Sequence, residues 1–461
     1  MKPWMLNDIA RLFGAIVSEN ITVLDVCTDS RAITPGCLFV ALEGERFDGH
    51  DFVHEAFAKG AVAAVCRKEI KDAEKPVIYV KDTQRALITI GCAYRLQYDI
   101  PIVAVTGSVG KTTTKDMIAC ALSANCKTLK TEGNRNNEIG LPLTLLNLDE
   151  TYGCAVLEMG MTHLGDLTLL SSATLPKVAV ITNIGVSHIE NLGSRENILK
   201  AKLEITEGLP ENGTLILNYD DDLLSDIKTY CDLAIISYGI ENTAADVTAK
   251  NIAREGEETH FTIRYKDGEY PARIPCIGTH NVLNALAAFS TAAALGFDLV
   301  KSTAALGSYV PSGMRQKIVR RGGFTVIEDC YNASPDSMRA ALGTLKTLRD
   351  ESGGRSIAVL ADMLELGSYS KSAHETVGQL AGQTEADILI AYGSEAAHIA
   401  RIAQEHGVRE VHYFKDKTQA AQKLIETAKP GDTILFKGSR GMRLEDIIER
   451  FYSGTDNNAR D

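Results

Sequence analysis

The segment Thr106-Gly-Ser-Val-Gly-Lys-Thr-Thr-Thr114 constrains the fold of this chain more than any other feature. It follows an apolar run rich in β-branched residues, 100–106, and precedes a stretch with helical periodicity. A strand, a glycine-rich turn and a helix in this order form a phosphate-binding loop, in which backbone N–H groups and the helix N-terminus face an anion. Because such a loop belongs to a layered sheet covered by helices, the sequence predicts an α/β fold.

Two residues of this segment suit the chemistry of a nucleoside triphosphate. Lys111 can reach the β- and γ-phosphates, and the hydroxyl of Thr112 can ligate Mg²⁺. The strict consensus has glycine at position 105, where this chain has Val105, so the match is partial. A Gly/Ser turn that merely caps a helix is the alternative interpretation.

The length of 461 residues corresponds to about three domains. Residues 1–82 combine short apolar runs with glycine-rich turns and predict a small N-terminal α/β domain. Residues 83–312 surround the phosphate loop and predict a central P-loop mononucleotide-binding domain with a parallel sheet. Residues 313–461 alternate strand-like and helical stretches and predict a C-terminal, Rossmann-like doubly wound domain without the G-x-G-x-x-G fingerprint.

The strand-like runs can be placed along the chain. In the central domain they are 100–106, 155–159, 178–184, 215–218 and 233–238, and in the C-terminal domain 325–329, 356–360, 387–392, 411–414 and 433–437.

Composition excludes several classes of function. The 48 Lys and Arg against 60 Asp and Glu give a net charge of −12, which disfavours nucleic acid or an anionic membrane surface as a partner. No apolar run reaches the ~18 residues of a membrane-spanning helix, and the N-terminal segment lacks the apolar core of a signal peptide. The ten cysteines stand singly, without metal-ligand spacings, which indicates reduced thiols. We therefore expect a cytoplasmic protein without membrane insertion. We also expect a monomer.

Two further residues at strand ends could serve a phosphate-bound metal. Glu158 ends the run 155–159 and can supply a hard carboxylate oxygen to Mg²⁺. His188 follows the run 178–184 and could ligate or orient a group at the same edge of the sheet. A solvated carboxylate and a structural histidine are the alternatives.

Lys202 has an unusual place in the helical pattern after Ser194, the residue expected to cap that helix. At 100° per residue, Ile198 and Ile205 define an apolar face, and Lys202 falls in its middle. Burial there would favour the neutral amine, which can act as a nucleophile or add CO₂ to become a carbamate. A lysine that extends its ammonium group into water is the alternative.

Several polar segments could contact a nucleotide or substrate. The turn 131–142 contains Asn136 and Asn137, which can bind phosphate or a carboxylate, although it could also be only a polar loop. Asn281, at the start of an Ala-rich helix, could cap the backbone or bond an adenine edge. Arg315 can bring a charged fork to phosphate. Asp329 ends a strand, where such folds bind ribose hydroxyls.

These motifs together resemble the Mur ligase family, the ATP-dependent amide-forming enzymes of peptidoglycan precursor synthesis. The resemblance extends from Asp29-Ser-Arg31 to Lys437-Gly-Ser-Arg440 and so covers all three expected domains. Within the family, the sequence is most similar to the members that join D-alanyl-D-alanine to UDP-N-acetylmuramoyl-tripeptide. Four strings carry that similarity: 106–115, 133–146, 331–336 and 360–367.

The resemblance implies a set of site residues. Valine at position 105 is normal in the family, which resolves the partial match. ATP would be bound by Gly107, Ser108, Val109, Gly110, Lys111, Thr112, Thr113, Asn281, Arg315 and Asp329. Thr112 and Glu158 would ligate one Mg²⁺, and His188 with a carbamoylated Lys202 would ligate a second. The UDP end would be bound around Ser30 and Arg31, other substrate groups by Asn136 and Asn137, and D-alanyl-D-alanine by the C-terminal domain, which would close over ATP.

The implied reaction passes through an acyl phosphate, because an amine does not displace oxygen from a free carboxylate. Two other functions stay open at this stage. One is a related ligase with a different acceptor, such as a member that adds the third residue of the peptide or a folylpolyglutamate synthetase. The other is a P-loop NTPase that acts as a switch or motor. Release of ADP only when both substrates are present would distinguish a ligase from a switch.

Overall fold

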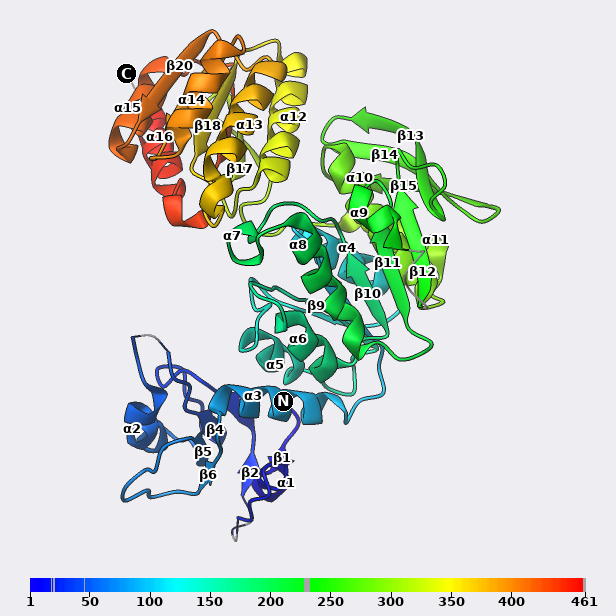
Figure 1. The fold of residues 1–461 in the computed structure, drawn as a ribbon, viewed down its shortest axis with the longest axis vertical. Coiled ribbons are helices and arrows are strands. Elements are labelled where there is room, and N and C mark those ends of the chain that lie inside the picture. Colours follow the sequence, from blue (N-terminus) through cyan, green and yellow to red (C-terminus); the bar gives the residue numbers. More distant parts are fainter. Residues whose placement is uncertain (18, 20, 45, 228–232, 459–461) are drawn as a thin grey trace.

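The computed structural model describes residues 1–17, 19, 21–44, 46–227 and 233–458. The chain runs from an N-terminal unit through a central unit to a C-terminal unit, and the first and last units lie at opposite ends of the molecule (Figure 1). Each unit is organised around its own sheet with helices packed on it. The predicted α/β fold class is therefore confirmed.

The N-terminal unit is built on a parallel sheet with the strand order β3-β4-β5-β6. Buried side chains of β4, β5 and α2 form an apolar cluster of their own. The elements are β1 (Trp4–Met5), α1 (Leu6–Arg11), β2 (Thr22–Val23), β3 (Asp25–Cys27), β4 (Cys37–Val40), α2 (Val53–Ala58), β5 (Ala63–Cys66) and β6 (Val77–Tyr79).

The central sheet has the strand order β15-β14-β13-β12-β11-β10-β7-β9-β8. All pairings from β8 to β13 are parallel, as predicted around a phosphate loop. Helices α4 and α10 pack on one face, while α3, α5, α6 and α8 pack on the other.

The central elements are α3 (Thr83–Arg95), β7 (Ile102–Thr106), α4 (Lys111–Ser123), β8 (Thr128–Lys130), α5 (Gly140–Leu145), β9 (Cys154–Glu158), α6 (Asp166–Thr174), β10 (Val178–Ile181), α7 (Ile189–Leu192), α8 (Arg195–Leu203), β11 (Thr214–Asn218), α9 (Asp222–Ser225), β12 (Ala234–Gly239), β13 (Val247–Glu255), β14 (Glu258–Tyr265), β15 (Gly268–Ile274), α10 (Thr279–Ala294) and α11 (Leu299–Ala305).

The prediction of a wholly parallel central sheet is wrong for its far edge. Strand β13 pairs antiparallel with β14, and β14 pairs antiparallel with β15. Residues 256–257 and 266–267 connect these strands, and such short turns cannot form the long crossover that parallel pairing needs. The predicted run 178–184 is also shorter in the structure, because the chain leaves β10 after Ile181 to contact the phosphate loop.

The C-terminal unit is the predicted doubly wound sheet, with the order β16-β17-β21-β18-β19-β20. Its pairings are parallel except for the edge strand β16, which is antiparallel to β17. The elements are β16 (Lys317–Arg321), β17 (Phe324–Asp329), α12 (Pro335–Ser352), β18 (Ser356–Ala361), α13 (Ser370–Gln383), β19 (Ile388–Tyr392), α14 (Ala396–Glu405), β20 (Glu410–Phe414), α15 (Lys417–Thr427), β21 (Thr433–Lys437) and α16 (Glu445–Asn458).

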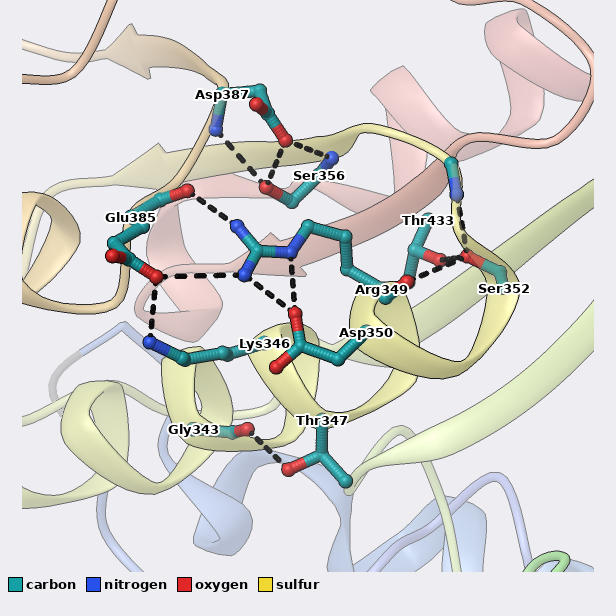
Figure 2. A network of polar contacts seen from close by, with 11 residues as sticks. Gly343, Lys346, Thr347, Arg349, Asp350, Ser352, Ser356, Glu385, Asp387 and Thr433 are labelled. Atoms are coloured by element: carbon teal, nitrogen blue, oxygen red, sulfur yellow. Dashed lines mark hydrogen bonds and ion pairs between the residues drawn. The ribbon is translucent and has the colours of Figure 1, made fainter.

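Polar contacts fix the end of α12 against the loop before β19 (Figure 2). Arg349 donates to the carbonyl of Glu385 at 2.7 Å, and Lys346 donates to the Glu385 carboxylate at 2.8 Å. Asp387 accepts from the backbone N–H and the hydroxyl of Ser356, both at 2.9 Å. These contacts hold α12, whose first turn faces the site described below, in a defined position on the sheet.

The cysteines and helices of the described residues agree with two further expectations. The nine cysteines in this part of the chain are free thiols, while Cys231 lies outside it. Within the same residues, no helix has both the length and the apolar character that crossing a membrane would require.

Candidate active site

A cavity of about 540 Å³ lies between the central and C-terminal units. The phosphate loop and the ends of β9 and β10 line one side, and the ends of β17 and β21 line the other. Most residues predicted for the site line this cavity: Ser108, Val109, Gly110, Lys111, Thr112, Thr113, Asn136, Asn137, Glu158, His188, Asn281, Arg315 and Asp329. Gly107, Lys202, Ser30 and Arg31 are not among the lining residues.

The phosphate loop is held by the segment that follows β10. Ser108 and Val109 donate their backbone N–H groups to the carbonyl and the side-chain oxygen of Asn183, at 3.0 and 2.8 Å. At Gly107 a Cβ would lie 1.8 Å from the Thr182 hydroxyl oxygen, so only glycine fits there. Because the N–H groups of 108 and 109 are occupied, the N-terminus of α4 supplies the free donors for an anion.

Lys111 is the first residue of α4 and folds back over the loop. Its Nζ donates to the carbonyl of Gly107 at 2.8 Å and contacts that of Ser108 at 3.4 Å. Burial lowers the pKa of this amine, nearby Glu158 raises it and Arg315 lowers it, with a net decrease from the ordinary value. The side chain thus stands at the position where a phosphate group would meet α4.

Glu158 lies at the end of β9, beside Val105 of β7, and is buried. One carboxylate oxygen accepts from the Thr112 hydroxyl at 2.7 Å and the other from the Asn136 amide at 2.8 Å. Both hydrogen-bond partners are neutral, and the nearby charge of Lys111 acts on Glu158 without a direct ion pair among the described residues. A buried carboxylate that is hydrogen-bonded to a hydroxyl is a donor set that fits Mg²⁺.

His188 follows β10 and precedes α7, and its ring borders the cavity. An acidic residue of the C-terminal unit, Glu365, faces it across the gap between the units. His188 and Glu158 therefore border the same cavity, as expected for two residues at one edge of the sheet.

Lys202 is 1% exposed on α8, the helix that Ser194 caps by accepting from the N–H of Asn197. Ile198 and Ile205 flank it and are fully buried, as the helical pattern predicted. No hydrogen bond or ion pair of its amine occurs among the described residues. Burial, with a smaller contribution from the charge of Lys111, lowers the pKa of Lys202 well below its ordinary value. Burial therefore favours the neutral form of this amine.

The nucleotide-side residues come from three segments. Asn281 donates its amide to the carbonyl of Ile277 at 2.8 Å. It does not cap α10, because Gly278 is the N-cap residue of that helix and no side chain accepts a capping hydrogen bond there. Arg315 lies over the ring of Tyr331 with its guanidinium carbon 3.9 Å from the ring centre. Asp329 ends β17 and pairs with Lys437 at the end of β21.

Asn136 and Asn137 occupy the loop before α5. Asn136 contacts Glu158, whereas the side chain of Asn137 accepts from the N–H of Gly140 at 2.9 Å and so caps α5. Both residues line the cavity, but the Asn136 side chain is hydrogen-bonded to Glu158 and the Asn137 side chain to the backbone of Gly140.

Ser30 and Arg31 lie in the N-terminal unit, away from the cavity. The carbonyl of Ser30 accepts from Lys59 at 2.9 Å, and Arg31 forms a two-point contact with Asp29 at 2.9 and 2.7 Å. The guanidinium of Arg31 lowers the pKa of Asp29 to about 2. Any role for these residues concerns a part of the substrate far from the phosphate loop.

Among the cavity residues that sequence reasoning did not select are His280, Tyr331, Glu365 and Lys437. Tyr331, Glu365 and Lys437 stand at or just after the ends of parallel strands, where α/β sheets bind ligands. That rule was applied to Asp329 at the end of β17, and its extension to the ends of β18 and β21 would have found Glu365 and Lys437.

Comparison with known proteins gives a consistent match along the chain. Residues 23–95 match the Mur ligase family, catalytic domain; residues 105–292 match the Mur ligase middle domain; and residues 314–440 match the Mur ligase, glutamate ligase domain.

Individual relatives match over nearly the whole length. The UDP-N-acetylmuramoyl-tripeptide–D-alanyl-D-alanine ligase of Bacillus subtilis is 40% identical over 435 residues, 94% of this chain and 93% of the relative. The structure of MurF from Acinetobacter baumannii matches with a TM-score of 0.90 and 32% identity, covering 98% and 99% of the two chains. MurF ligase from Thermotoga maritima in complex with ADP matches with a TM-score of 0.84 and 29% identity, covering 94% and 98%.

Proposed function

The chain belongs to the Mur ligase family and is an ATP-dependent ligase that joins D-alanyl-D-alanine to UDP-N-acetylmuramoyl-tripeptide, and on this premise we propose how its residues divide the reaction. The terminal carboxylate of the tripeptide takes the γ-phosphoryl group of ATP, giving an acyl phosphate and ADP. The amine of D-alanyl-D-alanine attacks the acyl carbon, and phosphate leaves from the tetrahedral intermediate.

The phosphate loop provides the positioning for the first step. The N-terminus of α4 binds the phosphates, and Lys111 exchanges its contacts with the loop carbonyls for the transferring phosphoryl oxygens. Arg315 brings a second positive charge from the junction with the C-terminal unit. The adenosine binds in the part of the cavity that Asn281 and Asp329 line.

Thr112 and Glu158 would hold one Mg²⁺, and His188 with Lys202 as its carbamate would hold a second. When bound, the cations offset negative charge on the phosphates and on the substrate carboxylate. What supports the first site is the buried Glu158 carboxylate with only neutral partners. What supports the carbamate is the buried, unpartnered Lys202 amine.

Each of the three domains binds a different part of the reactants. Residues 1–82 bind the UDP end of the substrate near Ser30 and Arg31, and residues 83–312 bind ATP. Residues 313–461 bind D-alanyl-D-alanine and close over the nucleotide, which excludes water that would hydrolyse the acyl phosphate. The free thiols of the described residues support a reducing compartment, the cytoplasm, as the place of reaction.

One observation carries this assignment of roles: the cavity is lined jointly by the phosphate loop and by the strand ends of the C-terminal unit. A nucleotide in it would contact both units. The transferred phosphoryl group and the incoming amine can then meet between domains that close together.

A coupled ADP-release assay tests the function. With ATP and UDP-N-acetylmuramoyl-tripeptide, we expect rapid ADP release only on addition of D-alanyl-D-alanine. Free D-alanine should be a very poor substitute, because its lack of the second residue leaves buried polar groups of the pocket unpaired, at about 1–3 kcal/mol each.

The alternatives give different outcomes in the same assay. Equal rates with D-alanine, diaminopimelate or L-lysine would contradict the dipeptide assignment. ADP release without any amine would indicate an NTPase switch.

A further inference from the structure

We propose that Lys437 is a positioning residue that makes Asp329 a ribose-selective acceptor, so that this lysine determines the preference of the enzyme for a nucleotide with intact ribose hydroxyls. The inference rests on the proposed binding of ATP at Asp329 and extends it to a residue to which no role has been given above.

The two residues are direct neighbours at one edge of the C-terminal sheet. Strands β17 and β21 are parallel, and Asp329 is in register with Lys437 at their carboxyl ends. The Lys437 Nζ donates to the Asp329 Oδ2 at 2.7 Å. The side chain of Lys437 is 2% exposed, so water does not screen this pair.

The Lys437 amine has protein acceptors on several sides. Its Nζ donates to the carbonyl of Asn332 at 3.1 Å and lies 3.5 Å from that of Asp329, in addition to its bond with the Asp329 carboxylate. These contacts direct the ammonium group toward Asp329 and Asn332, so we assign Lys437 an effect on the nucleotide through these neighbours.

The contacts of Lys437 orient both the Asp329 carboxylate and the loop that carries Tyr331. With Oδ2 held by Lys437, the Oδ1 atom of Asp329 has no hydrogen-bond partner within the described ranges, and Asp329 borders the cavity. The bond to Asn332 fixes the loop that carries Tyr331, whose ring lies under Arg315. One buried ammonium group thus holds both the free carboxylate oxygen and the aromatic ring at the nucleotide side.

The buried charge gives this arrangement its selectivity. A carboxylate oxygen that is held by a buried ammonium group keeps one orientation, and a carboxylate accepts a hydrogen bond from a hydroxyl more strongly than a neutral acceptor does. Without Lys437, the Asp329 carboxylate would turn toward water, and the preference for a ribose hydroxyl would be lost.

The test compares ATP with 2′-deoxy-ATP and 3′-deoxy-ATP in the ADP-release assay with both substrates present. We expect the wild type to favour ATP over one of the deoxy analogues by on the order of 10-fold or more in kcat/KM, as for a hydrogen bond to a charged group. Asp329→Asn should lower this ratio toward 1. Lys437→Met should do the same.

Control variants separate positioning from folding. Lys417→Met removes another Lys–Asp pair of the same unit, the one with Asp446, and should keep the wild-type ratio. If Lys437→Met does not fold, as judged by circular dichroism, Lys437→Arg carries the test. Its planar fork keeps the charge but cannot reach the same three acceptors, so the ratio should fall at least about 3-fold.

The outcomes distinguish ribose binding at Asp329 from the role of Lys437. A wild-type ratio near 1 would refute ribose binding at Asp329 and, with it, the role of Lys437. A ratio that falls in Asp329→Asn but keeps its wild-type value in Lys437→Met, or in Lys437→Arg where that variant carries the test, would refute the role of Lys437 alone. Equal loss of rate with all three nucleotides in Lys437→Met would also refute it, since that pattern indicates general structural damage.

Discussion

The Nδ1 atom of His188 in the central unit lies 2.9 Å from the Oε2 atom of Glu365 in the C-terminal unit, and both residues have a backbone φ of 63°. Non-glycine residues in this left-handed region cost about 1 kcal/mol or more each. A second contact between the two units lies nearby, in which the Tyr369 hydroxyl donates to the carbonyl of Gly193 at 3.2 Å. The strained pair therefore forms where the two units meet, at the edge of the proposed metal site.

The strain at Glu365 can be separated from its charge. Glu365→Ala and Glu365→Gly both remove the side-chain contact with His188, but only glycine adopts the left-handed conformation without steric cost. We expect Glu365→Gly to be more stable than Glu365→Ala by about 1 kcal/mol in urea unfolding, while the two lose similar activity. Tyr369→Phe is the control, since it removes a neighbouring contact between the units without touching His188. Equal stability of the two Glu365 variants would show that the backbone there is unstrained.

Lys111→Ala should abolish turnover without affecting the fold. Its amine contacts only loop carbonyls, so its loss removes the phosphate contact and no buried apolar volume. We expect kcat to fall at least about 100-fold and the thermal unfolding midpoint to stay within a few degrees. Lys127→Ala, a half-exposed lysine of the same unit, should keep its activity. Near-normal ligase activity in Lys111→Ala would refute the phosphate-loop assignment.

Asp116 on α4 anchors the linker between the central and C-terminal units. Its carboxylate accepts from the hydroxyl of Ser312 at 2.6 Å and from Lys130 at 2.8 Å, and it lies 3.2 Å from the Lys115 amine. Burial alone would raise the pKa of Asp116, but the two lysines and Ser312 outweigh it and lower the pKa below its ordinary value.

The stabilisation by Asp116 should depend on pH in a defined direction. Because the folded-state pKa is depressed, the carboxylate contributes fully above the unfolded value of 3.8, and its contribution is lost as the pH falls below that value. Asp116→Asn should cost about 3 kcal/mol at pH 7 and as much at pH 5, measured by urea unfolding. A cost that already declines between pH 7 and pH 5 would contradict the depressed pKa.

Features that depend on a short stretch of sequence could be predicted from the sequence. The loop 106–114 lies between β7 and α4 as predicted, and Glu158 lies beside it because β7 and β9 are adjacent parallel strands. Helical periodicity placed Lys202 on the apolar face of its helix and left open whether its ammonium group reaches water, and the structure shows the side chain buried. Each of these features depends on one strand, one helix or one turn.

Contacts between distant segments could not be predicted in the same way. Lys437 meets Asp329 only because β21 inserts between β17 and β18, and that strand order is not encoded in either segment. The pair His188 and Glu365 depends on how two separately folded units dock. The antiparallel strands β13 to β15 were not among the predicted strands, although short turns at residues 256–257 and 266–267 are a local signal for them.

Lys202 is expected to carry a carbamate in the active enzyme. The neutral buried amine adds CO₂ with loss of one proton, and the resulting anion would lie near the positive charge of Lys111, which now disfavours a second ammonium group there. In ¹³CO₂-equilibrated protein, we expect one carbamate resonance in the ¹³C spectrum that disappears in Lys202→Ala. That variant should be nearly inactive and partly rescued by acetate, which fits the vacated space, whereas Lys202→Met fills the same space and should resist rescue. Lys202→Arg cannot form a carbamate, so full activity in that variant would contradict the prediction.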